Sequence, residues 1–197
     1  MKNTKINNND NDNPNIEGEN HNTDNNNIDD DINEVENLKR RVQEQMKRAY
    51  FDIITCDIDN NDFDSTFAIL EEIRARICLV VPKRVDLHED MHEHLDVDHF
   101  RTMVKHNAFD ITMIKNIMNF IIDKIKQLGS ESDEPWNEIW RTQMHVRFER
   151  GEKLSTILPI FFKEALYRIE KIEYEISLFK KSILYKTLME QREKNSN

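Results

Sequence analysis

Residues 111–128 read ITMIKNIMNFIIDKIKQL, and the spacing of their apolar side chains decides the fold class. Apolar residues recur at intervals of three and four, which places them on one side of a helix of about 3.6 residues per turn. Asp110 stands at the position of an N-cap, and Gly129 at the position where a left-handed residue ends a helix. The predicted buried stripe consists of Ile114, Ile117, Met118, Ile121, Ile125 and Leu128.

The same helical pattern extends over most of the chain on both sides of this segment. Asp64 and Asp96 are predicted N-caps of two further helices, and Pro82 ends the first of these because proline lacks a backbone N–H. No segment of useful length alternates between apolar and polar residues, so we expect an all-α fold, an irregular multi-helix bundle. The other helices are predicted over residues 33–55, 65–81, 85–95, 97–106, from 132 or 133 onward, and 156–191.

The helix predicted over residues 156–191 has an apolar face along most of its length. Pro159 is expected in its first turn, where the missing N–H leaves no hydrogen bond unmade. The residues of this face, which we predict to be buried, are Leu158, Phe161, Phe162, Ala165, Ile169, Ile172, Ile176, Phe179 and Ile183.

The N-terminal segment has a different composition from the rest of the chain. Residues 1–37 contain 14 Asn and 10 acidic residues against 2 Lys, whereas the remaining residues carry 28 acids and 26 bases. Such a segment has too few apolar side chains to offset the entropy lost on ordering. We therefore predict a disordered, acidic, Asn-rich tail over residues 1–33 and a helical domain over residues 34–197.

Composition excludes several classes of function. The chain has three glycines, Gly18, Gly129 and Gly151, so it lacks a glycine-rich loop for a nucleotide phosphate and a nucleophile elbow. Cys56 and Cys78 form neither a CxxC pair nor a disulfide framework, which is typical of a reducing compartment. There is no signal-peptide pattern and no apolar run of membrane-spanning length. We expect a cytoplasmic protein with no cofactor and no membrane insertion.

Residues 88–92, His-Glu-Asp-Met-His, match the HExxH zinc motif literally. On a helix, His88 and His92 would share one face as zinc ligands, with Glu89 beside them as a general base. The extended form of the motif requires Gly and His at positions that hold Leu95 and Asp98 here. A zinc-dependent hydrolase is therefore the alternative hypothesis, against that of ordinary surface histidines.

A second alternative is nucleic-acid binding, which a modest basic cluster could support. Arg74, Arg76, Lys83 and Arg84 lie near the end of one predicted helix. The part of the chain that follows the tail is nearly neutral, however, and no aromatic residues alternate with these charges. We therefore expect no nucleic-acid partner.

Residues 71–122 carry a pattern that goes beyond generic helix. A helix ends at Pro82, basic residues and a Leu-x-Glu helix follow, and an Asp-x-Asp element precedes a turn into the apolar helix. This region resembles the T-complex protein 11 family, whose glycine in that turn corresponds to Asn107. Asparagine tolerates the left-handed conformation that such a turn requires. The matching elements are Lys83-Arg84, Leu87 and Glu89, Leu95-Asp96-Val97-Asp98, and Asn107-Ala108-Phe109-Asp110.

The resemblance implies a non-enzymatic helical adaptor or regulator in intracellular signal transduction, linked to cyclic-AMP and protein kinase A signalling. It carries no catalytic residues, and the family helix is simply charged where this chain has His88 and His92. Family members are usually longer than this chain, so we expect a short or truncated member. In a truncated member, the apolar face of residues 158–183 would lack its cover.

An adaptor needs an exposed surface for its protein partner. The helix over 156–191 and the segment with two tryptophans one turn apart are the candidates, and a homo-oligomer could form through the last helix. The candidate contact residues are Trp136, Trp140, Phe161, Phe162, Ile172 and Phe179.

Overall fold

The computed structural model describes residues 24–195, and the regular structure of that range is entirely helical, which confirms the predicted all-α class. The chain divides into two units, one ending at Lys47 and the other beginning at Arg48. The helices are α1 (Asp24–Asp59), α2 (Asp64–Val80), α3 (Val85–His94), α4 (Val97–Lys105), α5 (Ile111–Leu128), α6 (Glu134–Glu149), α7 (Leu154–Lys181) and α8 (Ile183–Asn195), with a short 3₁₀ helix, η1, at Glu131–Asp133. None of these helices combines the length and the apolar character needed to cross a membrane.

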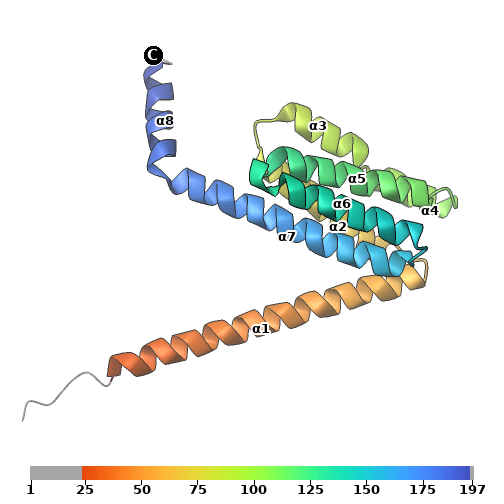
Figure 1. The fold of residues 1–197 in the computed structure, drawn as a ribbon, viewed down its shortest axis with the longest axis horizontal. Coiled ribbons are helices and arrows are strands. Elements are labelled where there is room, and N and C mark those ends of the chain that lie inside the picture. Colours follow the sequence, from red (N-terminus) through yellow and green to blue (C-terminus); the bar gives the residue numbers. More distant parts are fainter. Residues whose placement is uncertain (1–23, 196–197) are drawn as a thin grey trace, which may run out of the picture. The chain divides into compact units, whose positions relative to one another are not determined.

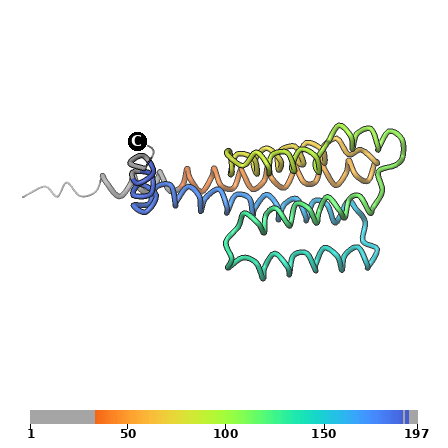
Figure 2. Tube along the Cα trace, turned by 90° about the horizontal axis from the view of Figure 1, so that it is seen from above, coloured from red at the N-terminus to blue at the C-terminus, as the bar shows by residue number. Residues whose placement is uncertain are grey.

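Helix α7 is the central element of the second unit. It packs against α2, α5 and α6, while α3 and α4 pack against α2 (Figure 1). Figure 2 shows α5, α6 and the first half of α7 running side by side. The bundle therefore brings the end of α5 and the start of α6 next to the middle of α7, where the candidate site lies.

The core fills the space between α2, α5 and α7 with large apolar side chains. Ile73 of α2, Ile121 of α5 and Phe162 of α7 are fully buried. Burial of each such side chain contributes about 1.5–3 kcal/mol. Around the start of α2, the rings of Phe63, Phe67, Phe100 and Phe109 form an aromatic cluster with centroids between 5.6 and 6.4 Å apart.

The predicted caps at Asp96 and Asp110 are confirmed. The side chain of Asp96 accepts a hydrogen bond from the backbone N–H of His99 at 3.0 Å, and that of Asp110 accepts one from Met113 at 2.9 Å. Asn107 has a φ of 53°, the left-handed conformation expected where the family has glycine. The turn between α4 and α5 is thus specified by its own residues.

Two predicted helix ends are wrong in detail. Asp64 is the first residue of α2 and not its cap: its backbone N–H donates to the Asp62 carboxylate at 2.9 Å. Gly129 has a φ of −78°, so it is extended and not left-handed. A Cβ atom on Gly129 would lie 3.0 Å from the carbonyl oxygen of Ile125, so glycine relieves a close approach there. An aspartate near a helix start and a glycine after a helix end are each compatible with more than one backbone geometry, so the sequence does not decide between them.

The helix predicted over 156–191 is two helices, α7 and α8, separated at Ser182. The Ser182 hydroxyl donates to the carbonyl of Phe179 at 2.6 Å and accepts from the N–H of Tyr185 at 3.2 Å. One side chain thus closes α7 and caps α8, because serine competes for backbone hydrogen bonds. Pro159 lies inside α7, beyond the first turn in which we predicted it, since the helix begins at Leu154.

Helix α1 is longer than predicted: it begins at Asp24 and ends at Asp59, against a predicted range of 33–55. Of the tail predicted over residues 1–33, residues 1–23 lie outside the described range.

Candidate functional site

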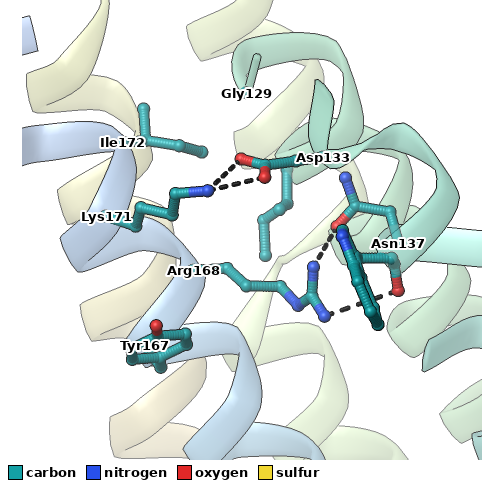
Figure 3. Close-up of a pocket in the computed structure, with 9 residues that line it drawn as sticks. Gly129, Asp133, Asn137, Tyr167, Arg168, Lys171 and Ile172 are labelled. Atoms are coloured by element: carbon teal, nitrogen blue, oxygen red, sulfur yellow. Dashed lines mark hydrogen bonds and ion pairs between the residues drawn. The ribbon is translucent and has the colours of Figure 1, made fainter. Parts of the chain in front are cut away.

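A cavity of about 260 Å³ lies between the start of α6 and the middle of α7 (Figure 3). Its lining residues recur at intervals of three and four on each helix, so α6 and α7 each turn one face toward the cavity. The end of α5 closes it on a third side. The lining consists of Ile125, Gly129, Asp133, Trp136, Asn137, Tyr167, Arg168, Lys171 and Ile172.

Arg168 makes most of the polar contacts in the cavity. It reaches from α7 toward α6, where its Nη1 donates to the Asn137 side-chain oxygen at 2.7 Å and its Nη2 to the Trp136 carbonyl at 3.4 Å (Figure 3). Its guanidinium carbon lies 5.0 Å from the centroid of the Trp140 ring, and it also pairs with Glu164 at 2.8 Å. The Arg168 Nε is buried without a hydrogen-bond partner. One strong donor therefore remains unsatisfied.

An ion pair between Lys171 and Asp133 joins α7 to the turn before α6 at one end of the cavity. The Lys171 Nζ donates to both carboxylate oxygens of Asp133, at 2.6 and 2.7 Å (Figure 3). This hydrogen bonding raises the pKa of Lys171 above its usual value. The pair links the turn before α6 to α7, and it leaves the charges of the cavity nearly balanced.

Two large aromatic side chains flank the cavity and face solvent. Trp136 and Tyr167 are each 62% exposed, although both belong to the cavity lining. Exposed aromatic side chains beside a desolvated arginine are typical of the residues that dominate protein–protein binding energies. The arrangement is suited to binding.

The predicted interaction residues divide between this surface and the core. Trp136 lines the cavity, and Phe179 is 44% exposed near the end of α7. Three others, Trp140, Phe161 and Phe162, are buried in the core, so this fold does not expose them to a partner, which corrects the prediction. Ile172 is also buried, although it belongs to the cavity lining. Trp140 stacks on Phe161 with ring centroids 5.1 Å apart, so these residues anchor α6 on α7. The predicted burial of Phe179 and Ile183 is also wrong, because α7 extends beyond the helices that cover it.

The two histidines of the HExxH match do not meet a third ligand in the part of the chain that the structure describes. His88 is half-buried, with its Nε2 3.1 Å from the carbonyl oxygens of both Cys78 and Val81 at the end of α2. His92 is exposed one turn further along α3. Between residues 24 and 195, no group of three or more His, Cys, Asp or Glu is arranged to hold a metal ion. The ring of His88 is thus engaged with the backbone.

Sequence reasoning missed the residues that α7 contributes to the cavity. The missed residues are Tyr167, Arg168 and Lys171. They lie on the polar side of a helix for which the sequence argument considered only the apolar face. A weak signal exists, since Glu164 and Arg168 are four residues apart and lie opposite the paired tryptophans. Asn137 gave no signal, yet it is almost fully buried by its contact with Arg168.

Fold and site define an all-helical protein with a cavity between two packed helices, flanked by two exposed aromatic side chains. The family model described as T-complex protein 11 matches residues 21–156, and the chain belongs to that family. The matched range contains α6, but it ends before Tyr167, Arg168 and Lys171. No curated protein and no solved structure matches the chain.

Proposed function

We propose that the chain is a non-enzymatic adaptor or regulator that binds a partner protein at the cavity between α6 and α7. The observation that carries the proposal is the exposure of Trp136 and Tyr167 beside Arg168, whose Nε is buried without a hydrogen-bond partner. Aromatic side chains supply large contact area at low entropic cost, and arginine adds directional hydrogen bonds.

The partner segment we propose has two features. An apolar side chain packs between Trp136 and Tyr167, and an acceptor oxygen reaches the unsatisfied Nε of Arg168. An unmade hydrogen bond of a buried charged donor costs free energy in the unbound chain, and a partner that supplies the acceptor recovers it. The balanced charge of Lys171 and Asp133 favours a segment without large net charge.

The cellular process we propose is intracellular signal transduction, with cyclic-AMP and protein kinase A signalling as the particular pathway. Family membership supports the general adaptor role, and the pathway rests on the resemblance described for residues 71–122. An adaptor of this kind alters where or when a kinase acts and needs no chemistry of its own.

Comparative affinity capture tests the binding surface. Trp136→Ala and Tyr167→Ala are expected to weaken capture of the same partner about tenfold or more, as truncated hot-spot residues do. Tyr174→Ala is the matched control, because Tyr174 is also on α7 and 64% exposed but lies outside the cavity lining. Equal partner recovery by all three variants would contradict the proposal.

A second experiment separates the pathway from the binding surface. Protein kinase A substrate phosphorylation is measured in cells after cyclic AMP is raised, with the wild-type chain or the Trp136→Ala variant expressed. We expect the wild-type chain to shift the phosphorylation level and the variant not to. Binding without any effect on phosphorylation would retain the adaptor role and refute the pathway.

A further inference from the structure

Helix α1 carries an apolar stripe that no side chain described in its own unit covers. Val35, Leu38, Val42 and Met46 are spaced by three or four residues, which places them on one side of the helix. Their side chains are between 45% and 67% exposed. A repeated stripe of this kind on a long helix is the pattern of a helix–helix interface.

The charges of α1 are separated along its length. Residues 24–36 contain six acidic residues and no basic one, whereas residues 37–48 contain five basic residues and one acidic one. Two copies of this helix that run in opposite directions would bring the acidic part of each beside the basic part of the other. Two parallel copies would instead place the two acidic parts side by side and the two basic parts side by side, which is unfavourable over most of the helix.

From this stripe and this charge separation we propose that α1 pairs with α1 of a second copy of the chain, antiparallel, with the two-fold axis near residue 37. Val35 then packs level with Leu38 of the second copy. Glu34 and Arg41 lie on the same edge of the stripe, because they are seven residues apart, so the long side chains of Glu34 and of Arg41 from the second copy can reach each other across the axis. Each copy contributes the same contacts, as a two-fold interface requires.

Sedimentation velocity over a concentration series tests the pairing with the full chain. The wild-type chain is expected to reach twice its monomer mass of 23.6 kDa, and Leu38→Asp is expected to remain a monomer. Glu44→Arg is the control, because Glu44 lies on the opposite side of α1 from the stripe, and it should dimerise as the wild type does. A monomeric wild type overturns the proposal, and so does a dimer that survives Leu38→Asp, since such a dimer would form elsewhere, for example through α7 and α8.

A charge exchange tests the direction of the pair. Glu34→Arg and Arg41→Glu should each abolish dimerisation, because each places like charges together across the two-fold axis. The double variant should restore it, because the pair is then reversed but intact. In a parallel pair, the guanidinium introduced by Glu34→Arg would approach Lys39 of the second copy, and the double variant would remain repulsive. Failure of the double variant to dimerise therefore overturns the antiparallel arrangement.

Discussion

At the residue scale, the side chain of His88 connects α3 to the end of α2 through contacts with backbone carbonyl groups. Its Nε2 lies 3.1 Å from the carbonyl oxygens of Cys78 and Val81 where α2 ends. The Val81 carbonyl also accepts from the N–H of Arg84 at 3.0 Å, whereas the residue four positions after Cys78 is Pro82, which has no N–H to donate. We predict that His88→Ala lowers the free energy of unfolding by about 1–2 kcal/mol, because it removes the side-chain contact to the Cys78 carbonyl at the end of α2. His92→Ala, at an exposed position of the same helix, should change it by less than about 0.5 kcal/mol.

Urea denaturation of the two histidine variants measures this difference. A zinc site would give another result, because loss of either ligand would be equally damaging and the purified wild type would contain stoichiometric zinc. Equal destabilisation together with zinc in the protein would contradict a structural role for His88.

The aspartates at the helix starts offer a second residue-scale comparison. Asp96→Ala and Asp110→Ala should each lower the free energy of unfolding by about 1 kcal/mol, since each removes a cap to a backbone N–H. Asp64→Ala should cost only about 0.5 kcal/mol, because Asp64 contributes its charge near a helix start but caps nothing. Thermal or urea denaturation checks the order, and a larger loss at Asp64 than at Asp110 would contradict the assignment.

Among the carboxyl groups that the structure describes, that of Asp86 has a pKa clearly below its ordinary value. The hydrogen bond from Arg84 lowers the pKa of Asp86 from 3.8 to about 2. Because the folded-state pKa is depressed, this contact stabilises the fold fully above about pH 4 and is lost as the pH falls toward 2. NMR titration should find the low pKa in the wild type and a pKa near 3.8 in Arg84→Ala. An unchanged pKa in that variant would refute the role of Arg84.

At the element scale, α7 has two different halves. Phe161 is fully buried between α6 and the rest of the core, whereas Phe179 contacts Tyr185 of α8 and remains partly exposed. We predict that Phe161→Ala lowers the free energy of unfolding by about 3–5 kcal/mol and Phe179→Ala by less than about 1 kcal/mol. Equal losses in denaturant titrations would mean that the second half of α7 is also covered.

The sequence predicts the helices of this chain well, because their apolar periodicity is strong and their caps are local. Asp96, Asp110 and Asn107 act as expected, since each depends on neighbours within four residues. The break between α7 and α8 at Ser182 was not predicted, because the apolar spacing continues across it. The local signal is a single serine, whose hydroxyl forms hydrogen bonds at the end of α7 and the start of α8. The wrong cap prediction at Asp64 shows the same limit, since the carboxylate that accepts a hydrogen bond at this helix start belongs to Asp62, two residues earlier.

At the scale of the whole molecule, the family could be predicted from residues 71–122, and the family model confirms it over residues 21–156. The cavity could not be predicted, because it depends on which faces of α6 and α7 meet. Trp136 and Trp140 look equivalent in the sequence, yet one lines the cavity and the other is buried beneath Arg168. Whether a tryptophan is exposed or buried here depends on how α6 packs against α7, which the spacing of residues within one helix does not specify.

Hydrogen exchange of the chain with and without its captured partner tests the central claim most directly, namely that the chain acts by binding a protein between α6 and α7. We predict slower exchange in residues 133–137 and 167–172, which line the cavity, and unchanged exchange in α3. Protection confined to α3, or to any surface that excludes the cavity, would contradict the claim.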